Sequence, residues 1–211
     1  MNATNDHPGF YDRFILPRLI DLTCRCKVAT ERRAALVPRA SGAVLEVGVG
    51  SGLNLGFYSA SVTRLVAVDP SEEMLSIARK RTAGAAFPVD LRRESADALS
   101  LEDRSVDTIV MTFTLCSIPE PLRALREMRR VLKPGGRLLF VEHGLAPDAG
   151  VRRWQERLNP LWNRLAGGCN LNRQVDVLLG EGGFRLAELH ADYLPGPRLL
   201  TYAYQGSALP A

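Results

Sequence analysis

The chain has 211 residues, of which 46% are hydrophobic and 24% charged, and its formal net charge is +4. This length and composition fit one globular domain with a sizeable core, and no apolar run reaches the roughly 18 residues that would span a bilayer. Dispersed basic residues without interleaved aromatic residues argue against nucleic-acid binding, and the absence of a signal peptide predicts a cytoplasmic protein.

Apolar periodicity predicts alternating helices and strands along the chain. Helices are predicted at 10–37, 52–59, 71–82, 119–132, 151–165 and 172–181, and strands at 43–48, 64–69, 87–92, 106–112, 137–142, 184–190 and 199–205. This alternation predicts a parallel sheet with helices on both faces. The turn sequence Pro195-Gly196-Pro197 separates the last two strands and predicts an antiparallel final pair. The chain is therefore predicted to form one α/β domain over residues 1–211.

The predicted N-terminal helix carries apolar residues at helical spacing, among them Phe10, Tyr11, Phe14, Ile15 and Leu19. One interpretation is a helix that simply packs on the sheet. The other is a lid over about residues 8–37 whose inner face contacts an apolar substrate, with Phe14 as the candidate contact. Both can hold together, because a lid must also bury its apolar face.

The first predicted strand runs into a loop with glycine at every second position, Gly48, Gly50 and Gly52. Glycine allows a backbone to approach a ligand closely and to adopt positive φ. The next strand ends on Asp69, an acid placed to accept hydrogen bonds from two ribose hydroxyls. The spacing predicts a nucleoside site without a pyrophosphate cradle, because Leu53 stands where a dinucleotide motif needs its third glycine.

Together with Glu46, the glycine pattern resembles the E/D-x-G-x-G-x-G signature of class I methyltransferases, which use S-adenosylmethionine (SAM). The resemblance implies a Rossmann-like sheet of seven strands, mostly parallel with an antiparallel last strand. It also implies SAM as cofactor and S-adenosylhomocysteine as product. The stretches 69–75, 95–99, 106–111 and 130–139 resemble further motifs of the family. The implied cofactor contacts are Tyr11, Glu46, Gly48, Gly50, Gly52, Asn54, Asp69, Pro70, Met74, Ala96, Asp97, Thr112 and Leu115.

The segment after the fifth strand, about 144–181, is expected to lie on the side of the methyl acceptor. With Glu142-His143, a Pro-x-Trp, a Gly-Cys-Asn-Leu and an arginine, it resembles the microsomal alkyl-thiol S-methyltransferases, and 114–117 is similar to them too. The hydrophobic N-terminal anchor of that family is absent here, and bacterial phospholipid N-methyltransferases share the same core. The candidate substrate residues are Phe14, Cys116, His143, Trp154, Trp162, Cys169 and Arg173.

His143 is the candidate catalytic residue, because it follows the fifth strand at the end where substrate and cofactor are expected to meet. An imidazole with an ordinary pKa of about 6.5 can accept a proton from a thiol or an amine near neutral pH. A structural role as a hydrogen-bonding group is the alternative. Both roles stay open at this point.

The four cysteines, Cys24, Cys26, Cys116 and Cys169, show neither metal-ligand spacing nor a framework of paired disulfides. They are interpreted as reduced thiols, and no metal site is predicted. Cys116 is interpreted as a residue that lines the acceptor pocket, because direct methyl transfer needs no covalent enzyme intermediate.

These motifs predict in-line methyl transfer from SAM to a small, rather apolar molecule, with a thiol as the leading acceptor. Holding both reactants in line can lower a barrier by roughly 7–11 kcal/mol. An amine, a phospholipid headgroup, an oxygen or a ring carbon is the alternative acceptor, and a non-catalytic SAM-binding protein is a further one. Nucleic acid is not an expected partner. Peripheral membrane contact and a monomeric or homodimeric state remain open.

Overall fold

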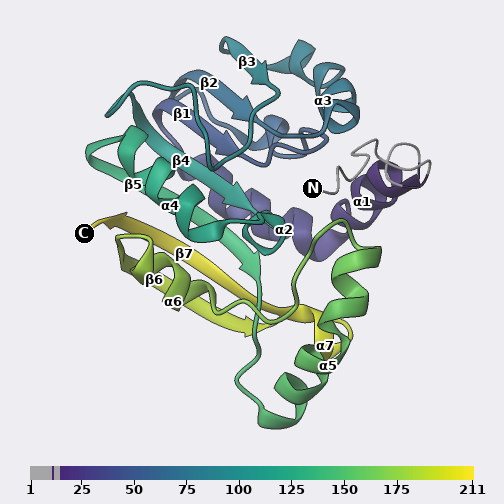
Figure 1. The fold of residues 1–211 in the computed structure, drawn as a ribbon. Helices are drawn as coiled ribbons and strands as arrows, with labels where there is room; N and C mark the ends of the chain where they lie inside the picture. Colours follow the sequence, from purple (N-terminus) through teal and green to yellow (C-terminus); the bar gives the residue numbers. More distant parts are fainter. Residues whose placement is uncertain (1–10, 12–14) are drawn as a thin grey trace, which may run out of the picture.

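The computed structural model describes Tyr11 and residues 15–211, and its centre is a sheet of seven strands within that part of the chain (Figure 1). The strands span Gly42–Val47 (β1), Val62–Val68 (β2), Val89–Arg92 (β3), Val106–Thr112 (β4), Leu132–His143 (β5), Phe184–Tyr193 (β6) and Tyr202–Pro210 (β7). Their order is β3-β2-β1-β4-β5-β7-β6. β1 to β5 pair in parallel, and β7 runs antiparallel to both of its neighbours. The predicted Rossmann-like sheet with a reversed last strand is confirmed.

Helices cover both faces of this sheet (Figure 1). They span Leu16–Cys24 (α1), Lys27–Leu36 (α2), Glu72–Arg79 (α3), Pro121–Val131 (α4), Ala149–Leu165 (α5), Val175–Glu181 (α6) and Arg198–Thr201 (α7), with short 3-10 turns at Val37–Arg39 (η2), Leu55–Phe57 (η3), Thr82–Gly84 (η4) and Leu115–Ser117 (η5). α4 and α6 pack into one buried cluster, whereas α2 and α3 contribute to a second cluster. Among the described residues, no helix combines the length and apolar character that a membrane crossing requires.

The predicted helix over 10–37 is two helices within the described residues, α1 and α2. The chain turns at Arg25, and Cys26 adopts extended backbone angles (φ −57°, ψ 150°) before α2 begins. Apolar periodicity continues across this break, so it could not reveal the turn. The predicted helix 52–59 is also wrong, because only the 3-10 turn η3 forms there after Gly52, whose φ is +81°. The last strand starts at Tyr202 rather than at 199, since α7 occupies the preceding residues.

The strand order determines where a ligand can bind. β1 lies between β2 and β4, so the chain proceeds outward in one direction up to β3 and in the other direction from β4. A sheet of this kind leaves a crevice at the carboxyl ends of the strands where the order reverses. The glycine loop, Asp69 and the segment after β4 all follow these strand ends.

Candidate active site

A cavity of about 320 Å³ opens at the carboxyl ends of β1, β2 and β4. Its walls come from the glycine loop after β1, from 68–71 after β2, from 94–96, from 112–114 and from 117–119. The first turn of α1 and Ile20 close one side, and Gly167 from the loop after α5 also reaches it. This volume lies within the range of small-molecule sites, roughly 300–1,000 Å³.

The three glycines of the loop serve different purposes. All have positive φ, +69° at Gly48, +53° at Gly50 and +81° at Gly52. A side chain at Gly48 would overlap Thr114, with its Cβ 2.2 Å from a Thr114 carbon, and one at Gly52 would approach Leu55 and Ala78. At Gly50 a Cβ would come close only to the end of the Met74 side chain, at 3.3 Å. Gly48 and Gly52 are therefore required by internal packing, whereas Gly50 leaves space on the cavity side.

Asp69 supports the glycine loop and also faces the cavity. Its carboxylate accepts hydrogen bonds from the backbone N–H of Gly50 and of Ser71, both at 2.9 Å. The side chain is buried, and this burial raises the pKa of its carboxyl group above the ordinary value. Each carboxylate oxygen accepts one of these bonds, which leaves lone pairs for the hydroxyls of a ribose.

Glu46 lies behind the loop and does not line the cavity. Its carboxylate accepts hydrogen bonds from Asn54 Nδ2 at 2.9 Å and from the Tyr58 hydroxyl at 2.8 Å. Burial raises the pKa of this carboxyl group to about 7. Asn54 does line the cavity, and its amide also donates to Thr112 Oγ1 at 3.0 Å. Glu46 thus orients a cavity residue from behind.

These residues fit the SAM that the sequence predicts. Asp69 offers the acceptor for ribose hydroxyls, and Met74 adds an apolar wall from the first turn of α3. The side-chain oxygen of Asn54 is buried and has no hydrogen-bond partner among the described residues. An unpaired buried acceptor in a cavity wall is costly unless a ligand donor reaches it, and the ammonium group of SAM is such a donor.

The structure brings most of the predicted cofactor residues to this cavity. The cavity is lined by Gly48, Gly50, Asn54, Asp69, Pro70, Met74, Ala96 and Thr112. Five others are not among its lining residues: Tyr11, Glu46, Gly52, Asp97 and Leu115. The Tyr11 hydroxyl instead donates to the Leu165 carbonyl at 2.9 Å, so this residue links the N-terminal segment to α5.

Two further cavity residues escaped the sequence reasoning. Arg33 of α2 is only 4% exposed, lies 5.3 Å from the centre of the Phe113 ring and donates to the Cys24 carbonyl. Phe113 adopts a positive φ of 54°, a conformation that non-glycine residues adopt rarely and that gathers at functional sites. An arginine on an ordinary helical pattern gives no sequence signal of burial, and neither does the backbone angle of a phenylalanine.

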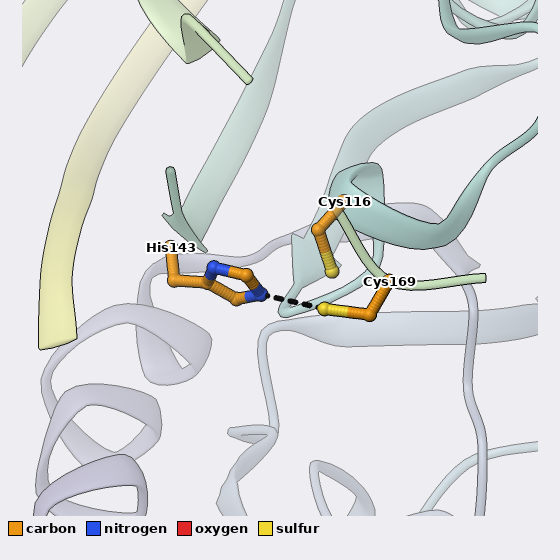
Figure 2. A group of neighbouring side chains, drawn as sticks. All are labelled: Cys116, His143 and Cys169. Carbon is orange, nitrogen blue, oxygen red and sulfur yellow. Dashed lines mark hydrogen bonds between the residues drawn. The ribbon is translucent and has the colours of Figure 1, made fainter. Parts of the chain in front are cut away.

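Three of the predicted substrate residues, Cys116, His143 and Cys169, lie together (Figure 2). Cys116 belongs to η5 after β4, His143 is the last residue of β5, and Cys169 lies in the loop after α5. His143 Nε2 is 3.0 Å from Cys169 Sγ. The hydrogen bond from Cys116, together with the neighbouring His143, lowers the pKa of the Cys169 thiol, whereas the pKa of Cys116 is raised by Cys169 and by burial.

The backbone around this cluster is held by buried polar groups. Glu142 is fully buried, and its carboxylate accepts from the Thr114 N–H at 2.9 Å. Arg173 donates to the Ile118 carbonyl at 2.6 Å and also to the Leu115 carbonyl. Asn170 Nδ2 donates to the Cys116 carbonyl at 2.9 Å. Arg173, predicted as a substrate residue, therefore supports the η5 turn.

The predicted aromatic substrate residues separate into different places. Trp154 of α5 is 56% exposed, and its ring lies 5.8 Å from the Arg157 guanidinium. Trp162 is half-buried, and its buried indole N–H has no hydrogen-bond partner among the described residues. Phe14 lies outside the described residues.

Comparisons with known proteins identify methyltransferases as relatives of this chain. The family described as a methyltransferase domain matches residues 45–140. The chain is 36% identical over 159 residues to human thiol S-methyltransferase TMT1B, a match that covers 74% of this chain and 64% of that protein. It is 42% identical over 121 residues to the phosphatidylethanolamine N-methyltransferase of Cereibacter sphaeroides, covering 56% of this chain and 59% of that protein.

Solved structures show the same fold. A SAM-dependent methyltransferase from Aquifex aeolicus superposes with a TM-score of 0.64 at 20% identity and covers 92% of this chain and 98% of that one. A second, from Methanosarcina mazei, has a TM-score of 0.64 at 22% identity and covers 79% and 91%. The chain spans about 64% of the length of the thiol S-methyltransferases that it matches.

Proposed function

The chain belongs to the class I methyltransferases that use SAM, and from this premise we propose that it transfers the cofactor's methyl group to a small, rather apolar thiol. The observation that carries the choice of a thiol is the similarity to thiol S-methyltransferases from human and rat, at 32–38% identity over 72–74% of this chain. The segment after β5, with His143 and Cys169, supports the same choice, because it resembles that family.

When bound, SAM supplies a methyl carbon that its positively charged sulfur has already activated. The protein must therefore position both reactants and exclude water. We assign the ribose to Asp69, the close approach of the cofactor to Gly50, and the ammonium group to Asn54. The acceptor enters from the side of α1 and of the loop after α5, because Leu16, Ile20 and Gly167 line the cavity there.

We assign to His143 the positioning of the acceptor and help in removing its proton. The imidazole lies at the carboxyl end of β5, next to β4, whose following residues line the cavity. His143 itself is not a lining residue, but it lies beside Cys116, and Thr114 and Ser117 of the same segment line the cavity. His143→Ala is therefore expected to lower turnover about 10²–10⁴-fold while SAM affinity stays within about twofold. A parallel loss of SAM affinity would remove this assignment.

Transfer to nitrogen is the second candidate. It is favoured by the 42% identity to the Cereibacter sphaeroides phosphatidylethanolamine N-methyltransferase, although that match covers only 56% of this chain. The shared region supports a common cofactor core and does not by itself choose the acceptor.

The two candidates are separated by a panel assay with SAM labelled in its methyl group. Alkyl thiols, aryl thiols, primary amines and phosphatidylethanolamine vesicles are each incubated with the purified full chain. We expect label in the thiols alone, and Asp69→Ala as a control with weakened cofactor binding should reduce it when SAM is below saturation. Label in amines or in phosphatidylethanolamine, with none in any thiol, would replace S-methyl transfer by N-methyl transfer.

A further inference from the structure

Cys116, His143 and Cys169 bring together the donor atoms that zinc prefers. They come from three separate segments, and their two sulfurs and one ring nitrogen all lie within 4.8 Å of one another. Figure 2 shows the imidazole and both sulfurs directed toward a common point. Within Tyr11 and 15–211, no other group of three histidine, cysteine or acidic side chains is arranged in this way.

This donor set matches a catalytic type of zinc site. Zinc binds cysteine sulfur at about 2.3 Å and histidine nitrogen at about 2.0–2.1 Å in a tetrahedral arrangement. Two thiolates and one neutral imidazole would balance the two positive charges of the ion. Three protein ligands leave the fourth position free for water or a substrate, as in catalytic sites with two cysteines and one histidine. His143 Nε2 and Cys169 Sγ, now 3.0 Å apart, would have to separate by a few tenths of an ångström.

We propose that Cys116, His143 and Cys169 bind one zinc ion whose fourth position takes the sulfur of the acceptor. Binding of the ion follows from the three side chains alone. The part of the proposal that places a thiol on the ion rests on the proposed function.

Neighbouring residues limit the protein ligands to three. The carboxylate of Glu142 is already bonded to the Thr114 N–H and lies in the buried layer, so it does not supply a fourth donor. Arg173 fixes the turn that carries Cys116 through the Leu115 and Ile118 carbonyls. Its positive charge would also offset the extra negative charge when a third thiolate arrives.

The cluster borders the cofactor cavity. Thr114 and Ser117, on either side of Cys116, line that cavity, and so does Gly167, two residues before Cys169. A thiol held at the fourth position would therefore be presented close to the cofactor. The arrangement explains how one segment of the fold can both hold an acceptor and activate it.

The chemistry balances without an oxidant or a reductant. A thiol that binds zinc gives its proton to solvent and remains as a thiolate near neutral pH, because a coordinated thiol loses its proton readily. In this site His143 assists the loss of the proton as a ligand of the ion and does not accept the proton itself. The thiolate sulfur forms a bond to the methyl carbon while the carbon–sulfur bond of SAM breaks. That electron pair stays on S-adenosylhomocysteine, and the neutral thioether then leaves the ion.

Metal content tests the site without any assay of activity. We expect the full chain, purified without chelator from zinc-supplemented cells, to contain about one zinc per chain by plasma mass spectrometry. Cys169→Ala and Cys116→Ser should each reduce this at least tenfold. Cys26→Ala is the matched control and should retain the metal, because Cys26 is exposed at the break between α1 and α2 and does not line the cofactor cavity. Calorimetric SAM binding, unchanged in all three variants, shows that each one is folded.

Cobalt reports on the geometry. Addition of Co²⁺ to the metal-free chain should give the visible bands of tetrahedral cobalt and a sulfur-to-cobalt charge-transfer band, and an alkyl thiol should shift both. A chain that binds SAM but no zinc, or the same cobalt spectrum in Cys169→Ala, would overturn the proposal. A cobalt spectrum that no thiol alters would overturn the open fourth position. Methylation of amines alone in the panel assay would instead refute the thiol as acceptor. The metal measurements would still test whether the three side chains bind zinc.

Discussion

Within the glycine loop, we expect some residues to serve folding and others to serve cofactor binding. Gly48 contacts Thr114 so closely that only a hydrogen atom fits, whereas Gly50 borders the cavity beside Met74. Asp69 connects the two functions, because it accepts from the Gly50 N–H and lines the same cavity. The loop can therefore be tested with substitutions that separate stability from affinity.

Gly50→Ala is expected to weaken SAM binding at least tenfold with only a small loss of stability. Its positive φ costs an alanine roughly 1 kcal/mol, and the added methyl group projects toward the cofactor space. Gly48→Ala should instead lower the free energy of unfolding by several kcal/mol, because its methyl group overlaps Thr114. Calorimetry with SAM and urea denaturation measure the two effects. Equal effects of both variants on stability would contradict this division.

Asp69→Ala should lower SAM affinity tenfold or more. Hydrogen bonds to a charged group contribute about 1.5–3 kcal/mol, and about 1.4 kcal/mol corresponds to a factor of ten. Since Asp69 also accepts from the Gly50 and Ser71 N–H groups, a modest loss of stability should accompany it. Asp97→Ala is the control, because Asp97 does not line the cavity. If Asp97→Ala weakened SAM binding more than Asp69→Ala, the assignment of the ribose to Asp69 would be wrong.

At the scale of elements, α5 begins the segment that we propose to face the acceptor, and a buried side chain attaches this helix to the rest of the chain. Gln155 of α5 is 1% exposed, and its side chain bonds to the backbone of two other segments. Its amide donates to the Gly144 and Leu199 carbonyls, both at 3.1 Å, and its oxygen accepts from the Ala146 N–H at 2.9 Å. One side chain thus connects the end of β5, α5 and α7.

Gln155→Leu is expected to destabilise this attachment. It removes the partner of two buried backbone groups, the Ala146 N–H and the Gly144 carbonyl, and of the half-buried Leu199 carbonyl. Each buried group left without a partner costs about 1–3 kcal/mol. Glu156→Ala, an exposed neighbour on the same helix, should change the free energy of unfolding by less than about 0.5 kcal/mol. Chemical denaturation measures both, and hydrogen exchange should show faster opening of α5 in Gln155→Leu. A Gln155→Leu variant as stable as the wild type would show that water or repacking satisfies these groups.

At the scale of the whole molecule, a buried carboxyl group makes stability depend on pH. Glu46 sits in β1 at the centre of the sheet, and burial raises its pKa to about 7 against the hydrogen bonds from Tyr58 and Asn54. Arg33 lowers this pKa and Asp69 raises it. The folded state therefore binds a proton that the unfolded chain has already released between about pH 4.5 and 7.

The free energy of unfolding should consequently fall as pH rises through this window, by up to about 3 kcal/mol from Glu46. Glu46→Gln should flatten this part of the profile and leave a smaller slope from other groups, among them Glu142. Urea denaturation of both proteins between pH 4.5 and 8 measures the difference. A variant profile parallel to that of the wild type would show that Glu46 is ionised in the folded chain.

Local patterns in the sequence predicted much of the fold and of the cofactor side. Strands such as 106–112 were found at their observed positions, because a buried parallel strand is a short continuous apolar run. Gly50 and Asp69 could be placed at the cavity because both follow strand ends. The break at Cys26 and the turn at η3 could not be predicted from the sequence, because apolar periodicity does not reveal a change of backbone direction.

The sequence by itself determined the class of fold and the residues that we propose to hold the nucleoside of SAM, because strand hydrophobicity, glycine backbone freedom and a strand-end acid are local properties. Only the tertiary structure decided that the Glu46 carboxylate accepts a hydrogen bond from Asn54 and that Arg173 holds the turn after β4. It alone also brought His143 against Cys169, 26 residues away in the chain, and both beside Cys116. Such contacts depend on strand order and on the path of the loop after α5, which residue spacing does not encode.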